Sequence, residues 1–215
     1  MSAREPSLRT VWTGGRRKLL ADPAFRRIAV CLGASQFAAV ALQTLWVATW
    51  LRDVAAYSQA EVARGLLAVN VSMIAGYMAF GRAADVMQRR GQSALPLLFF
   101  GVGLSSASLF LIILGLQSLL LWCAFVAAGT AVVLGYAILS RRYPKEISGR
   151  VNTAINLFGF VGMFGGQWGI GLVLDLWPAS ATGYAAEAYP WALGMVWAAQ
   201  LAGLAWLWLG RGLFR

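Results

Sequence analysis

The sequence predicts an all-α membrane protein, a bundle of six transmembrane helices with both termini in the cytosol. Of the 215 residues, 60% are hydrophobic and only 12% are charged, whereas about a quarter of the residues of a soluble domain are charged. Six apolar runs reach the length of roughly 20 residues that a membrane-spanning helix needs. Basic residues are concentrated in alternate connections between these runs.

The predicted spans follow a tail, residues 1–27, that carries seven basic residues. Asp22-Pro23 marks the start of the first helix, because proline is tolerated in a first helical turn. Only Gln117-Ser118 separates the third run from the fourth, which predicts a tight helical hairpin. Residues 28–215 then form a single transmembrane domain, with spans at residues 28–51, 60–81, 94–116, 119–139, 153–175 and 191–210.

The distribution of basic residues predicts the orientation of the bundle. Sixteen of the 18 lysines and arginines lie in the N-terminal tail, in residues 82–93 and 140–152, and after residue 210. Only Arg52 and Arg64 lie in connections on the other side. Because cytoplasmic connections carry the excess of basic residues, the basic side is cytosolic. We expect an integral protein of a bacterial inner (plasma) membrane, with both termini in the cytoplasm.

Several functional classes are excluded or disfavoured by composition. The chain has no histidine, which excludes His-ligated metal and haem sites and His-dependent catalysis. Its two cysteines, Cys31 and Cys123, are predicted near opposite membrane faces, too far apart for a disulfide. We find no nucleophile–base pair, metal cluster or phosphate loop, and therefore expect no enzymatic activity and no cofactor. Membrane topology accounts for the net charge of +10, so we expect no nucleic-acid partner.

One predicted cytosolic segment, GRAADVMQRRG, combines Gly81, Asp85, Arg89 and Arg90. The glycine allows close approach of two backbones. The carboxylate can complement the N-terminal dipole of a neighbouring helix. The arginines can pair with carboxylates or anionic headgroups. An ordinary positive-inside loop would also contain paired arginines, so that interpretation stays open.

A second basic segment contains Arg150 and precedes the fifth span. That span is rich in glycine, and small residues spaced three and four apart let helices pack closely or slide past each other. A static packing surface with no role in transport would have the same spacing, so both interpretations stay open. The glycines are Gly159, Gly162, Gly165, Gly166, Gly169 and Gly171.

The segment from Gly81 resembles the G-x-x-x-D-R-x-G-R-R signature of the major facilitator superfamily, although Val86 and Gln88 depart from it. The Arg150 loop and the glycine-rich helix resemble the corresponding parts of a facilitator half. The basic tail leading into Asp22-Pro23 resembles the central linker of the family. The chain therefore resembles the C-terminal six-helix half, and the resemblance implies two inverted three-helix repeats.

The resemblance also implies a solute site near the bilayer midplane, between two halves and lined by helices one, two, four and five. Buried polar groups are costly in a membrane, so mid-span polar side chains on these helices are our candidates. The alternative is that these side chains bond between helices and only hold the bundle together. The candidates are Gln36 and Gln43 in the first span, Asn70 and Tyr77 in the second, and Asn156 and Gln167 in the fifth.

The function that follows from the resemblance is transport of a small solute by alternating access. The expected partners are membrane lipids, the solute, and either a separate six-helix half or a second copy of this chain. No charged residue is predicted at mid-span, so ion coupling would come from the other half or be absent. A second interpretation stays open, in which the chain is a non-transporting remnant of a truncated gene or a membrane scaffold.

Overall fold

The computed structural model describes residues 19–178 and 183–214, and the side chains of 145 and 146 are not described. Throughout these ranges the regular structure is helical. Six helices are long and apolar enough to cross a membrane, which confirms the predicted number of spans and makes the chain an integral membrane protein. The predicted basic tail lies mostly outside the described residues and stays a prediction.

Two of the six spans contain a change of helix type. The first consists of α2 (Pro23–Ala41), a π-helical turn η1 (Leu42–Trp46) and α3 (Val47–Asp53). The fourth consists of α6 (Leu119–Gly129), a 3₁₀ turn η2 (Thr130–Val133) and α7 (Leu134–Arg142). The others are α4 (Gln59–Arg89), α5 (Leu95–Ile113), α8 (Lys145–Leu174) and α9 (Tyr189–Leu209), the last preceded by η3 (Ala186–Ala188) and followed by η4 (Arg211–Phe214).

The predicted connections at residues 82–93 and 140–152 are shorter in the structure than in the prediction. Helix α4 continues to Arg89, and α8 begins at Lys145, so only Tyr143 and Pro144 separate α7 from α8. Apolar runs mark the part of a helix that lies in hydrocarbon, whereas arginine, alanine and methionine favour helix on either side of that boundary. For this reason, the prediction made both connections too long.

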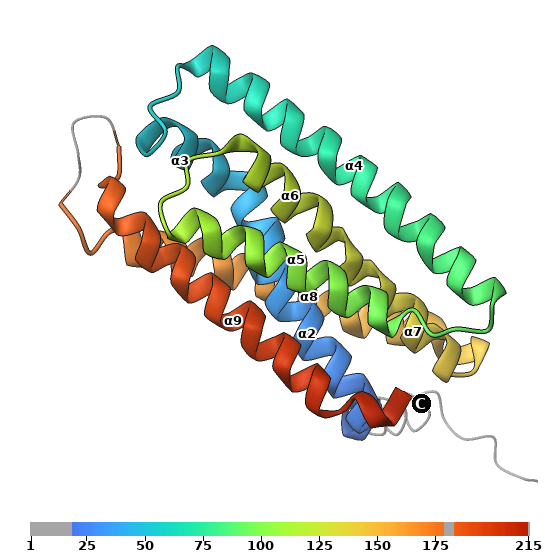
Figure 1. Ribbon diagram of the computed structural model, residues 1–215. Helices are drawn as coiled ribbons and strands as arrows, with labels where there is room; N and C mark the ends of the chain where they lie inside the picture. Colours follow the sequence, from blue (N-terminus) through green and yellow to red (C-terminus); the bar gives the residue numbers. More distant parts are fainter. Residues whose placement is uncertain (1–18, 179–182, 215) are drawn as a thin grey trace, which may run out of the picture.

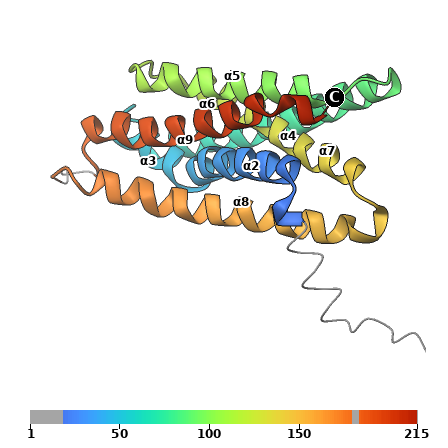
Figure 2. The same ribbon diagram turned by 90° about the horizontal axis from the view of Figure 1, so that it is seen from below.

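The six spans lie side by side, and both described ends of the chain lie at the same end of the bundle (Figure 1). We name this end the basic end and the opposite one the far end. Helix α2 packs on α8 and α9, α6 packs on α4 and α5, and α5 also contacts α9. Figure 2 shows α2 in the middle of the bundle, with α8 on one side and α5 and α9 on the other.

The first and fourth spans form the core, whereas α4 and α8 are covered least. In their most apolar stretches, 50% and 56% of the residues of the first and fourth spans are buried. The corresponding values for the second and fifth spans are 17% and 22%. Large apolar side chains on α4 and α8 remain exposed, among them Leu67, Val71, Phe164 and Trp168.

Glycines bring the backbone of α8 directly against that of α2. A Cβ atom added at Gly162 would overlap the carbonyl oxygen of Gly33, and one at Gly166 would lie 2.6 Å from that of Phe37. By contrast, a Cβ at Gly165 would have no neighbour within 4 Å. Gly162 and Gly166 therefore form the close-packing surface that the spacing predicts.

At the basic end, Asp22 holds the start of α2. Its carboxylate caps the helix by accepting a hydrogen bond from the backbone N–H of Ala24 at 2.8 Å. It also accepts one from the Tyr143 hydroxyl and lies 3.7 Å from Nε of Arg142. Burial alone would raise the pKa of Asp22, but these partners outweigh it and hold the pKa below its ordinary value. Asp22 thus joins the first span to the connection between the fourth and fifth.

At the far end, Asp53 holds the end of the same span. Its side chain is 0% exposed and accepts a hydrogen bond from Nε of Arg52 at 2.7 Å. The hydroxyl of Tyr189 donates to the carboxylate at 2.8 Å, and the backbone N–H of Tyr184 donates at 3.2 Å. Buried charges need such partners, since an unpaired one is strongly destabilising. Asp53 therefore fixes the first span to the start of the sixth.

Gly162→Ala is expected to lower the free energy of unfolding by about 1–3 kcal/mol, because the added methyl group overpacks the contact with Gly33. The measurement is a titration of the reconstituted protein with sodium dodecyl sulfate, followed by circular dichroism. Gly165→Ala is the matched control and should be neutral or slightly stabilising, since its methyl group has open space. Equal losses in both variants would contradict close packing of α8 on α2.

Asp22→Ala is expected to cost about 1 kcal/mol near neutral pH, mostly through the lost helix cap. Because the folded-state pKa of Asp22 is lowered, its contribution is complete above the ordinary carboxyl pKa of about 3.9. The contribution is lost as the pH falls through the lower folded-state pKa. The stability difference between wild type and variant should therefore shrink only below about pH 4. If the stability difference already vanished at about pH 6, the titrating group responsible would not be Asp22.

Candidate functional site

A chain of polar side chains crosses three helices at the π-helical turn of the first span. Nε2 of Gln43 donates to Oδ1 of Asn70 on α4 at 3.1 Å. The next residue, Thr44, accepts a hydrogen bond from Nε2 of Gln167 on α8 at 2.8 Å. Gln43 and Thr44 both lie in η1 and so reach α4 and α8 respectively. We call this set (Asn70, Gln43, Thr44 and Gln167) the far tier.

The far tier is held by local bonds as well. The Thr44 hydroxyl donates to the carbonyl of Val40 at 2.7 Å, and Nδ2 of Asn70 donates to that of Leu66 at 2.7 Å. Threonine bonds of this kind perturb the regular helical ladder, and π-helical turns often occur at functional sites. Among the described residues, none donates to Oε1 of Gln43 or of Gln167, so both carbonyl oxygens remain available to a ligand.

A second group of polar side chains, nearer the basic end, joins the fourth span to the fifth. The hydroxyl of Tyr136 on α7 donates to Oδ1 of Asn156 on α8 at 2.6 Å. One turn away, Ser140 donates to Asn152 at 3.3 Å. We call Tyr136 and Asn156, together with Tyr77, the near tier. Tyr77 is 48% exposed on α4 and has no hydrogen-bond partner in the described part of the chain.

The structure brings together some of the predicted site residues but not all. Gln43 pairs with Asn70, whereas Asn156 and Gln167 find partners that sequence reasoning missed, Tyr136 and Thr44. Both missed residues are polar and within predicted spans, and Thr44 directly follows a candidate. Gln36 forms no hydrogen bond with the other candidates, and its Cγ lies 3.5 Å from the position of a Cβ at Gly159. Whether these residues line a solute path stays a prediction.

The residues of the signature-like segment lie in the last turns of α4, where Ala84 is buried in the core and Asp85 points away from it. Asp85 is exposed and, among the described residues, has no hydrogen-bond or ion-pair partner. Among the described residues nothing lies within 4 Å of a Cβ added at Gly81, so the close approach expected there does not occur in this part of the chain. Arg89 and Arg90 are exposed at the end of α4, and Arg150 is exposed near the start of α8.

The described residues contain no group of three or more histidine, cysteine and carboxylate side chains placed to hold a metal ion. No protein-family model matches the chain, and neither the curated proteins nor the solved structures include a match. The resemblance to the major facilitator superfamily therefore rests on the sequence motifs alone and stays a prediction.

Proposed function

We propose that the chain is one half of a major-facilitator-type transporter and carries a small solute between this bundle and a second six-helix bundle. The observation that carries the proposal is the position of the two polar tiers. They lie on the first, second, fourth and fifth spans, and α4 and α8 are the least covered helices. Exposed amides facing hydrocarbon would lose several kcal/mol of hydrogen bonding each. A water-lined path avoids this cost.

The contacts between helices support two related three-helix repeats. The first span packs on the fifth and sixth, the fourth packs on the second and third, and the third contacts the sixth. If the first span is exchanged with the fourth, the second with the fifth and the third with the sixth, the same pairs of spans remain in contact. Inverted repeats require this symmetry. Glycines occupy corresponding contacts, with Gly162 of the fifth span on the first and Gly76 of the second span on the fourth.

The same proposal gives the exposed segment of α4 a role. Asp85 is exposed at the basic end and has no partner among the described residues, so it can accept hydrogen bonds from the N-terminus of a helix in the other half. Sixteen of the 18 basic residues lie in the sequence segments predicted to be cytosolic, which supports a cytosolic position of that end. Alternating access would then rock the two bundles about the tiers. The tiers contain amides and hydroxyls and no charged group, which favours a neutral, hydrogen-bonding solute.

Cysteines in the tiers are expected to react with a charged, water-soluble methanethiosulfonate in intact membranes, in a background with Cys31 and Cys123 replaced by alanine. The variants are Asn156→Cys and Gln167→Cys. A thiol reacts as its thiolate, which forms in water and not in hydrocarbon. Leu104→Cys is the control, because Leu104 is 44% exposed on α5, away from both tiers. Labelling is measured by mass spectrometry and does not require a known substrate.

The expected result is modification of both tier cysteines and not of the control. If the tier cysteines were as unreactive as Leu104→Cys, the polar side chains would only hold the bundle together. The alternative of a non-transporting scaffold or remnant would then be favoured.

The uncovered face of α4 and α8 is expected to meet another six-helix bundle. Phe164→Cys, at a position 63% exposed on α8, should cross-link to a second copy or to a separate six-helix chain in native membranes. Leu104→Cys should give no product, since α5 packs mainly on α6 and α9 and is not part of this face. Gel mobility and mass spectrometry identify the product. Protein that remains monomeric in lipid, with no cross-link at either position, would contradict assembly through this face.

A further inference from the structure

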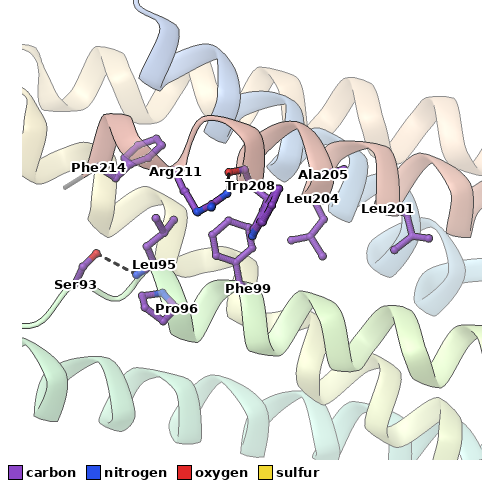
Figure 3. A pocket seen from close by; sticks show the side chains of 10 residues that line it. All are labelled: Ser93, Leu95, Pro96, Phe99, Leu201, Leu204, Ala205, Trp208, Arg211 and Phe214. Carbon is purple, nitrogen blue, oxygen red and sulfur yellow. Dashed lines mark hydrogen bonds between the residues drawn. The ribbon is translucent and has the colours of Figure 1, made fainter.

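A cavity of about 810 Å³ opens between α5 and α9 at the basic end of the bundle (Figure 3). Its walls are largely apolar. Pro96 and Phe99 of α5 face Leu204, Ala205 and Trp208 of α9 across it. Neither tier contributes to this lining, so the cavity is separate from the proposed solute path.

A second cavity, of about 400 Å³, adjoins the first and has a different chemistry. Its lining includes Gln88 and Gln92 near the end of α4, and Arg141 and Arg142 at the end of α7. Ser93 and Phe214 line both cavities. The apolar cavity therefore lies next to a polar, basic one.

The basic cavity has two arginines, of which Arg142 has a carboxylate partner and Arg141 has none among the described residues. Arg142 lies 3.7 Å from Asp22 and donates to the carbonyl of Leu213 at 2.9 Å, which holds η4 as a wall of the cavity. Arg141 is exposed and forms no ion pair with any described side chain. Arg211 lines the apolar cavity, where its guanidinium lies 3.8 Å from the ring centroid of Trp208, and it has no carboxylate partner among the described residues.

We propose that the two cavities together bind one anionic phospholipid. An acyl chain fits along the apolar cavity between α5 and α9, and the phosphate fits beside Arg141 and Arg211. Basic cavities between transmembrane helices are suited to anionic headgroups, and tryptophan and arginine favour the interfacial level. The large apolar cavity argues against a free anion, which would use only the smaller one. This lipid site does not depend on the chain being a transporter.

The test is native mass spectrometry of the purified full-length protein with equal amounts of phosphatidylglycerol and phosphatidylcholine of matched acyl chains. We expect the wild type to retain phosphatidylglycerol selectively. The double variant Arg141→Gln/Arg211→Gln should weaken this binding about 30-fold, the effect of two arginines near the headgroup. Arg26→Gln, an exposed arginine of α2 at the same end and outside both cavities, should leave it unchanged.

A second pair of variants tests the acyl-chain cavity and serves if the arginine variants fail to fold. Ala205→Trp fills the cavity and should reduce phosphatidylglycerol binding by a similar factor, whereas Ala202→Trp, exposed on the same helix but outside the lining, should not. Equal retention of the two lipids would overturn the proposal, as would an equal loss in Arg26→Gln. Complete displacement of phosphatidylglycerol by inorganic phosphate would also overturn it, since that result would show a site for a small anion.

Discussion

The backbone contact between the first and fifth spans is the constraint on which the rest of the bundle depends. Gly162 and Gly166 allow α8 to lie directly against Gly33 and Phe37 of α2, where any side chain would separate the two helices. Aspartates then fix the first span at each end, Asp22 to Tyr143 and Asp53 to Tyr189. Backbone packing sets the lateral position of the span, and the carboxylates set its position along the bundle axis. Of the other five spans, the second, fourth, fifth and sixth pack on the first one or are hydrogen-bonded to it.

The far tier follows from that fixed position. Because the first span is held against α8, Thr44 comes within 2.8 Å of Gln167, and the π-helical turn directs its neighbour Gln43 toward Asn70 on α4. A regular helix would also separate consecutive side chains by about 100°. The position of the turn between α4 and α8 therefore matters more than its π-helical geometry. In this position, the adjacent residues Gln43 and Thr44 contact different helices.

The spans and their number could be predicted from the sequence, because hydrocarbon solvation selects long apolar runs whatever their packing. Helix ends could not, since α4 continues as a helix through the polar residues to Arg89. Among the site residues, amides such as Gln43 were found because polar groups in spans are rare. Tyr136 and Thr44 were missed because their roles depend on three-dimensional neighbours. Periodicity assigns a residue to a helix face but does not identify the opposing residue.

The contrast between the outer helices supports the proposed assembly, in which a second bundle would cover α4 and α8 in place of lipid. On α5 and α9 the polar side chains turn inward, and Gln200 and Ser105, both 0% exposed, lie 3.5 Å apart between the two helices. On α4 and α8 the opposite holds, since Asn70 and Asn156 are exposed. A chain that buries polar groups on its third and sixth spans but exposes them on its second and fifth has two different environments around it. Hydrocarbon suits the first pair, and only water or another protein suits the second.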